Sequence, residues 1–220
     1  VQEMYSERKV LLGHRRLSII DLSPSASQPM TEVSRNYWIV YNGEIYNHKE
    51  IRNELEKKGM IFKTDHSDTE VILNAYSQWG IDCIQRFRGM FAFCLWDVKK
   101  DLFWLVRDRL GKKPLYYTVH NGALFFASEI KAIFKNPAIN RAINKKALCD
   151  YLTFGSTAAP DTMFEGIQKL HSAHLIKIHG NTISSQQRYW NVLEQSRIIF
   201  RNEEEVIDNL MSCFKESVNY

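Results

Sequence analysis

Closely spaced aromatic segments constrain the fold more than any other feature of the sequence. MFAFCLWD (90–97) and DLFWLVRD (101–108) are separated by residues 98–100 alone, and PLYYTVH (114–120) leads through an Asn-Gly turn into another apolar stretch, 124–127. Aromatic and β-branched residues favour strands. Strands that are joined by short turns pair antiparallel. These segments therefore predict antiparallel sheets, with a further hairpin over HLIKIHG and NTISS (174–185).

Helical patterns occur in groups and do not alternate strictly with the strands. In the first of them, Ile51 and Leu55 are spaced i, i+4 within HKEIRNELEKKG, and Asn47 is placed to cap the helix. The other segments with helical spacing are HSDTEVILNAYSQWG (66–80), SEIKAIF (128–134), NKKALCDYLTFG (144–155) and EEEVIDNLMSCFKESV (203–218). This layout predicts an α+β fold, and it excludes a doubly wound parallel sheet.

Composition excludes several classes of partner. The 220 residues are 45% hydrophobic and 25% charged, which is typical of a globular protein with a real core. The net charge of +4 comes from scattered residues, and basic runs are pairs such as Lys57-Lys58, so we expect no nucleic-acid partner. Because we find no apolar run of about 18 to 20 residues and no signal peptide, we expect no membrane partner and a cytoplasmic protein.

The cysteines do not predict a metal site. Their spacing contains no C-x-x-C pair. Each lies in an apolar stretch, as in FAFCLWD and ALCDYL, so we expect all of them to be buried small hydrophobic residues in a reducing compartment. The cysteines are Cys83, Cys94, Cys149 and Cys213.

The segment YNGEIYN (41–47) allows two interpretations. Asn-Gly between apolar residues is a strong hairpin signal. The same pair could instead donate hydrogen bonds to a developing negative charge. A helical pattern, and not a second strand, follows at residue 48. This disfavours a plain hairpin, although we still expect a turn at Asn42-Gly43.

Several charged residues could bind a ligand, and each also has a plain structural explanation. Arg16 could clamp a carboxylate with its guanidinium fork or lie at a strand edge. Asp68 could hold an ammonium group or face the helix dipole from the first turn. Glu44 could belong to a site or face solvent. RDRLGKKPLYY (107–117) could be no more than a well-built loop.

Taken together, these motifs resemble one family. The ordered blocks are GHRRLSIIDLS, QPM, YNGEIYN, SDTEVI, FRGMFAF-x-LWD, RDRLGKKPLYY and FASEIKA. In order and spacing they resemble the glutaminase domain of glutamine-hydrolysing asparagine synthetases, which are class II amidotransferases of the N-terminal-nucleophile hydrolase type. The resemblance implies a four-layer αββα sandwich of mostly antiparallel sheets, here incomplete at its N-terminal end.

The resemblance also implies roles for five residues. Arg16 matches the clamp on the glutamine α-carboxylate, and Asp68 matches the acid that holds the α-amino group. Glu44 matches a second acid at the amino-acid end of the substrate. Asn42 and Gly43 match the oxyanion hole, whose donors are each worth about 2.7–4 kcal/mol in other enzymes. We expect all five to line one concave site, with no metal.

The sequence departs from the family at both ends. The family's nucleophile is an N-terminal cysteine whose own α-amine is the base, whereas the sequence begins at Val1. We therefore expect the chain as printed not to hydrolyse glutamine. Residues 1–200 match the amidotransferase domain, and 201–220 resemble the first helix of an ATP-dependent synthetase domain. That synthetase domain would be the partner of the amidotransferase domain, and it would use ATP and Mg²⁺ to activate aspartate for amidation. Whether the protein forms a homodimer stays open.

Two other functions stay open at this point. A glutaminase-like module without its nucleophile could sense glutamine or mediate assembly. An amidotransferase of this type could also amidate another carboxylate, such as a sugar acid, because the acceptor is chosen outside the printed residues.

Overall fold

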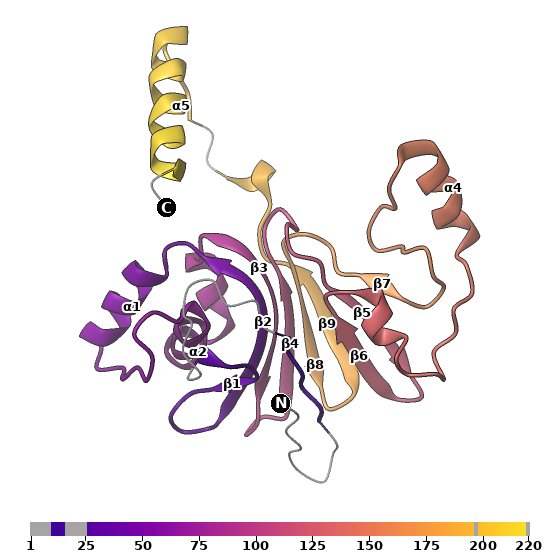
Figure 1. Ribbon diagram of the computed structural model, residues 1–220. Helices are drawn as coiled ribbons and strands as arrows, with labels where there is room; N and C mark the ends of the chain where they lie inside the picture. The colour runs from indigo at the N-terminus through magenta and orange to yellow at the C-terminus, as the bar shows by residue number, and fades with distance from the viewer. Residues whose placement is uncertain (1–9, 16–25, 196–197, 219–220) are drawn as a thin grey trace. The chain divides into compact units, whose positions relative to one another are not determined.

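The structure is a computed structural model that describes residues 10–15, 26–195 and 198–218 (Figure 1). The chain divides into two compact units, Val1–Trp190 and Asn191–Tyr220. The strands are β1 (Met30–Thr31), β2 (Tyr37–Ile45), β3 (Gly89–Asp97), β4 (Leu102–Arg107), β5 (Tyr116–His120), β6 (Ala123–Ala127), β7 (Gln168–Lys169), β8 (His174–His179) and β9 (Thr182–Arg188). The α-helices are α1 (His48–Lys57), α2 (Asp68–Trp79), α3 (Ile130–Ile133), α4 (Lys145–Phe154) and α5 (Glu203–Val218), and 3-10 helices cover Gly80–Arg86 and Val192–Glu194.

Two antiparallel sheets form the centre of the first unit. The large sheet has the order β1-β2-β3-β4-β8-β9, and the small sheet has the order β6-β5-β7. All neighbouring strands are antiparallel, and the expected hairpins β3–β4, β5–β6 and β8–β9 are present. The α+β prediction is therefore confirmed.

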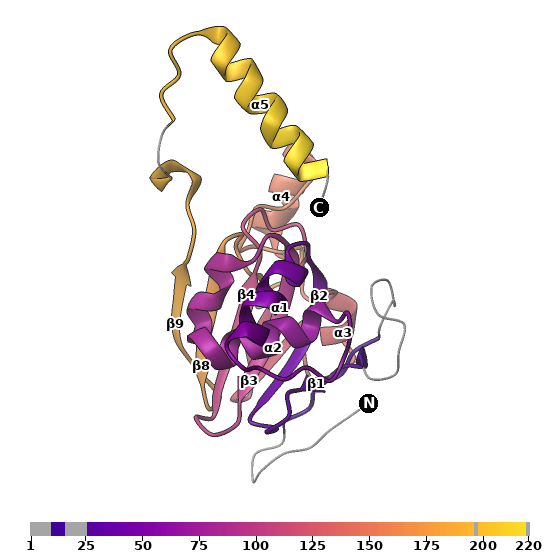
Figure 2. The ribbon, with the colours of Figure 1, turned by 90° about the vertical axis from the view of Figure 1, so that its left-hand side faces the viewer.

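The sheets and helices form the four expected layers (Figure 1). Helices α1 and α2 cover the outer face of the large sheet (Figure 2), and the small sheet packs on its inner face. Alternate residues of β2 separate the first two cores, with Ile39 and Tyr41 on the helix side and Trp38 and Val40 between the sheets. Helix α3 closes the outer face of the small sheet. The order αββα is as predicted.

The prediction of a turn at Asn42-Gly43 is wrong. Strand β2 continues through both residues to Ile45, and Gly43 pairs with Phe91 of β3. Gly43 has a φ of +158°, and a Cβ there would lie 2.2 Å from the Met90 carbonyl oxygen and 2.7 Å from the Phe91 Cα. This glycine therefore serves the close approach of two strands and does not reverse the chain.

Asn47 does not cap helix α1 with its side chain, contrary to expectation. Its Nδ2 donates to the Arg86 carbonyl at 3.0 Å, and its Oδ1 accepts from the Arg88 amide at 2.8 Å. The side chain thus fixes the segment that leads into β3, because two long-range backbone groups compete successfully with the helix terminus.

The segment after β4 is the well-built loop that its composition allows. The guanidinium of Arg107 donates to the carbonyls of Gly111, Lys113 and Leu170 at 2.5–2.7 Å. The carboxylate of Asp108 accepts from backbone amides on the same loop and from the amide of Phe91. Both side chains are buried, so these backbone groups replace the water that would otherwise solvate the two charges.

The second unit contains the predicted helix α5. None of its residues is buried, and its apolar stripe, which includes Val206, Leu210 and Phe214, is exposed. Among the described residues, we find no helix with the length and hydropathy that a membrane crossing requires.

Candidate functional site

The site is built around the free edge of strand β2. The Tyr46 amide donates to the Arg88 carbonyl at 2.7 Å, which fixes the hydrogen-bonding phase of β2 against β3. Pairs in an antiparallel ladder alternate between hydrogen-bonded and non-hydrogen-bonded. Gly43 and Phe91 therefore form a non-hydrogen-bonded pair, and the Gly43 amide points away from β3. The amides of Tyr41 and Ile45 point to the same edge.

The amides of Tyr41 and Ile45, on either side of Gly43, already donate hydrogen bonds to side chains. The Tyr41 amide donates to Gln28 Oε1 at 2.6 Å, and the Ile45 amide donates to Asp68 Oδ2 at 3.1 Å. Gly43 lies between them, and within the described ranges no side chain or strand accepts from its amide. The edge thus presents one backbone donor whose direction is fixed by its neighbours on either side.

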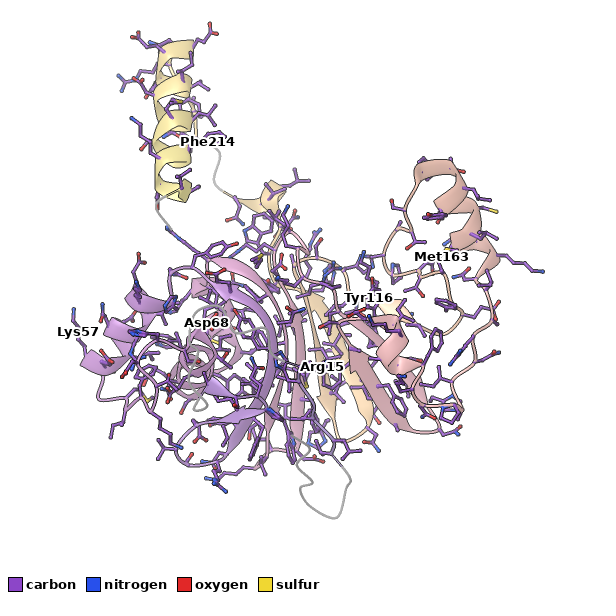
Figure 3. The ribbon with its side chains drawn as sticks, viewed as in Figure 1. Arg15, Lys57, Asp68, Tyr116, Met163 and Phe214 are labelled. Atoms are coloured by element: carbon purple, nitrogen blue, oxygen red, sulfur yellow. The ribbon has the colours of Figure 1, made fainter. Side chains whose placement is uncertain are left out.

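Asp68 is the buried acid of the site. It is the first residue of α2, on the helix-covered side of the large sheet (Figure 3), and only 7% of its surface is exposed. Its Oδ2 accepts from the Tyr41 hydroxyl at 2.7 Å as well as from the Ile45 amide. Burial raises the pKa of the carboxyl, and the Tyr41 and Ile45 hydrogen bonds and nearby His48 partly offset this rise.

The other two predicted residues on β2 have different surroundings. Asn42 Nδ2 donates to Ser128 Oγ at 3.2 Å, which links the strand to the segment after β6. Glu44 is half-buried. Burial raises the pKa of the Tyr46 hydroxyl, and the charges of Glu44 and Asp108 raise it further. Glu44 and Asp68 together give this end of β2 a negative charge.

The structure brings four of the five predicted residues together. Asn42, Gly43 and Glu44 are consecutive in β2, and Asp68 is hydrogen-bonded to the same strand. Arg16 lies outside the described residues. Our sequence reasoning missed Gln28 and Tyr41, although both belong to motif blocks, QPM and YNGEIYN, that carried the resemblance.

The cysteines fall into two classes, and the expectation that all are buried is wrong for half of them. Cys83 and Cys94 are buried, and burial raises the pKa of both thiols. Cys149 and Cys213 are exposed, because α4 buries only Ala147 and α5 buries no residue. In the part of the chain that the structure describes, we find no group of three or more metal-binding side chains.

The fold is similar to that of a solved structure. The structure superposes with a TM-score of 0.54 on the glutamine phosphoribosylpyrophosphate (PRPP) amidotransferase of B. subtilis in complex with ADP and GMP. The match covers 80% of this chain and 34% of the other, at 18% identity. The layered antiparallel sheets are thus arranged as in that protein.

The sequence comparison identifies the family. The chain belongs to the glutamine amidotransferase domain family, whose profile matches residues 1–190. It is 36% identical over 218 residues to asparagine synthetase [glutamine-hydrolyzing] 3 and 34% identical over 215 residues to asparagine synthetase [glutamine-hydrolyzing] 1, both of Bacillus subtilis (strain 168). Each match includes 98% of this chain, which spans 35% and 33% of the length of those relatives.

Proposed function

We propose that this domain binds glutamine at the edge of β2. Asp68 holds the α-ammonium group, Arg16 the α-carboxylate, and Glu44 adds negative charge at the same end. Asn42 and the Gly43 amide donate to the oxygen that becomes negative when the side-chain amide is attacked. One observation carries the proposal: Gly43 presents its amide between two amides that Gln28 and Asp68 already occupy.

We further propose that the longer protein is an asparagine synthetase. It would hydrolyse glutamine to glutamate and ammonia and pass the ammonia to an aspartate activated by ATP. ATP and Mg²⁺ would belong to its synthetase domain, which would be the partner of the domain described above. The names of both Bacillus relatives support this activity.

Hydrolysis needs a thiolate near the oxyanion donors, about 3 Å from the reacting carbon. The thiols of Cys83 and Cys94 are buried with raised pKa values. Cys149 and Cys213 are exposed, but they are internal and bring no α-amine to act as base. We infer that the 220 printed residues bind glutamine without hydrolysing it.

Calorimetric titration of the 220-residue chain with L-glutamine tests the binding site. Asp68→Asn keeps an oxygen for the Tyr41 and Ile45 donors and removes the charge. It should weaken binding about 10- to 100-fold, because hydrogen bonds to charged groups contribute about 1.5–3 kcal/mol. Asp161→Asn, which alters an acid paired with Lys146 on the surface, is the matched control and should bind like the parent chain. Equal affinities of the Asp68 variant and the parent would refute the site.

The activity of the longer protein needs a second measurement. Asparagine formation from aspartate and ATP is compared with glutamine and with ammonium as nitrogen source. Asp68→Asn should lower the glutamine-dependent rate and keep the ammonium-dependent rate. An equal loss with both sources would contradict the assignment of Asp68 to glutamine, and no asparagine with either source would contradict the synthetase.

A further inference from the structure

We propose that Tyr41 is a positioning residue, which orients the Asp68 carboxylate so that one of its oxygen atoms faces the α-ammonium group of the substrate. This inference rests on the proposed glutamine site and assigns a role to a residue that the motif comparison passed over. Tyr41 would act through Asp68 and would not touch the substrate.

The two long-range hydrogen bonds to Asp68 are made to the same oxygen atom. The Tyr41 hydroxyl and the Ile45 amide both donate to Oδ2, at 2.7 and 3.1 Å. An ionised carboxylate can accept about four hydrogen bonds. The two donors thus hold Oδ2 against β2, and together with the Thr69 amide, which also stabilises the anion, they leave at least one acceptor position for a further donor. An ammonium group satisfies this need, since it carries only donors.

Tyr41 is itself held at three points. Its backbone amide donates to Gln28 Oε1 at 2.6 Å, and Gln28 Nε2 reaches Thr69 Oγ1, beside Asp68, at 3.5 Å. Its ring packs against Gly43, where a Cβ would lie 3.0 Å from Tyr41 Cε2. The third point is the hydroxyl bond to Asp68. The ring is only 4% exposed, so its hydroxyl has a fixed direction.

The same hydrogen bond favours the charged form of Asp68. Burial raises the pKa of this carboxyl, while the Tyr41 hydroxyl, the amides of Ile45 and Thr69, and the nearby His48 lower it. The acidic neighbours of Tyr41, besides Asp68, are Glu44 and Tyr46. Without the Tyr41 hydroxyl, the pKa of Asp68 should rise further, because one of the donors that stabilise the anion is lost.

Tyr41→Phe tests the role, with Tyr117→Phe as the matched control. Tyr117 is equally buried, at 4% exposed, and its hydroxyl donates to Gln186 Oε1 at 3.3 Å, away from β2. Glutamine binding to both variants and to the parent chain is measured by calorimetry between pH 4 and pH 8. Tyr41→Phe should weaken binding about tenfold at neutral pH, which is the scale of one hydrogen bond to a charged group. Its loss of binding on acidification should also begin at a higher pH than in the parent.

The outcomes separate this inference from the proposed function. If Tyr41→Phe matches Tyr117→Phe in affinity and in pH profile while Asp68→Asn binds glutamine more weakly than the parent chain, the positioning role is wrong and the glutamine site stands. If Asp68→Asn binds normally, the glutamine site itself is wrong. Should Tyr41→Phe not fold, the parent chain labelled with 3-fluorotyrosine replaces it. The more acidic hydroxyl should then move the acid limb of binding to lower pH, and an unmoved limb would overturn the role.

Discussion

Replacing Gly43 with alanine should separate strands β2 and β3 of the large sheet. The added Cβ would lie 2.2 Å from the Met90 carbonyl oxygen and 2.7 Å from the Phe91 Cα. Both are backbone atoms, so no side chain can rotate out of the way. The substitution also places a side chain at a φ of +158°, a conformation that favours glycine.

The size of the effect follows from these two contributions. Overpacking a tight contact costs about 1–3 kcal/mol, and an unfavourable backbone conformation costs about 1–3 kcal/mol. We expect Gly43→Ala to lower the free energy of unfolding by about 4 kcal/mol, which is a large part of the roughly 5–15 kcal/mol that holds a domain folded. Gly122→Ala is the matched control, because its φ is +72° but a Cβ there meets nothing within 4 Å. Gly122→Ala should cost about 1 kcal/mol, which is the scale for an L-residue in the left-handed region.

Urea denaturation followed by tryptophan fluorescence measures both variants. With a slope of about 3 kcal/mol per molar urea, the midpoint should fall by about 1.3 M for Gly43→Ala and by about 0.3 M for Gly122→Ala. Midpoints that fall equally would show that conformation alone matters at Gly43. The close approach of the two strands would then not be the reason for a glycine at this position.

Two further results are expected. Alkylation of the native chain should modify Cys149 and Cys213 and spare the buried Cys83 and Cys94, so intact mass should show two adducts before unfolding and four after it; rapid modification of all four in the native chain would contradict the burial. Burial raises the pKa of Tyr76 to about 12 from an ordinary value of 10.0, so the unfolded chain loses this proton first as the pH rises. The free energy of unfolding should therefore fall between about pH 10 and pH 12, and an equally steep fall in Tyr76→Phe would show that this hydroxyl does not contribute.

Features that depend on neighbouring residues were predictable from the sequence. The hairpins β3–β4, β5–β6 and β8–β9 have turns of only a few residues, so apolar spacing and turn chemistry are enough to locate them. The helices α2 and α4 likewise begin after Ser67 and Asn144, whose side chains accept from the first turn. The residues next to each hairpin turn and helix start thus determine where these elements lie.

The errors concern contacts between distant residues. A glycine can serve either a turn or the close approach of two strands, and only the position of β3 shows that Gly43 serves the second. Asn47 bonds to Arg86 and Arg88, about 40 residues along the chain, so its role could not be read from the helix that follows it. The bonds of Tyr41 to Gln28 and Asp68 span 13 and 27 residues. Motif resemblance indicated Asp68 but gave no reason to connect it with Tyr41.

The loop after β4 has a consequence for how this protein can vary. Arg107 and Asp108 are adjacent, and both bind the backbone of the loop, the first through the carbonyls of Gly111 and Lys113 and the second through amides. Backbone groups are common to nearly all amino acids, so side chains between 109 and 113 can change without loss of these bonds, apart from Gly111, whose φ is +64° and whose Cβ would meet Arg107. An insertion or deletion would move every carbonyl and amide out of reach. The loop should therefore tolerate changes of sequence far better than changes of length.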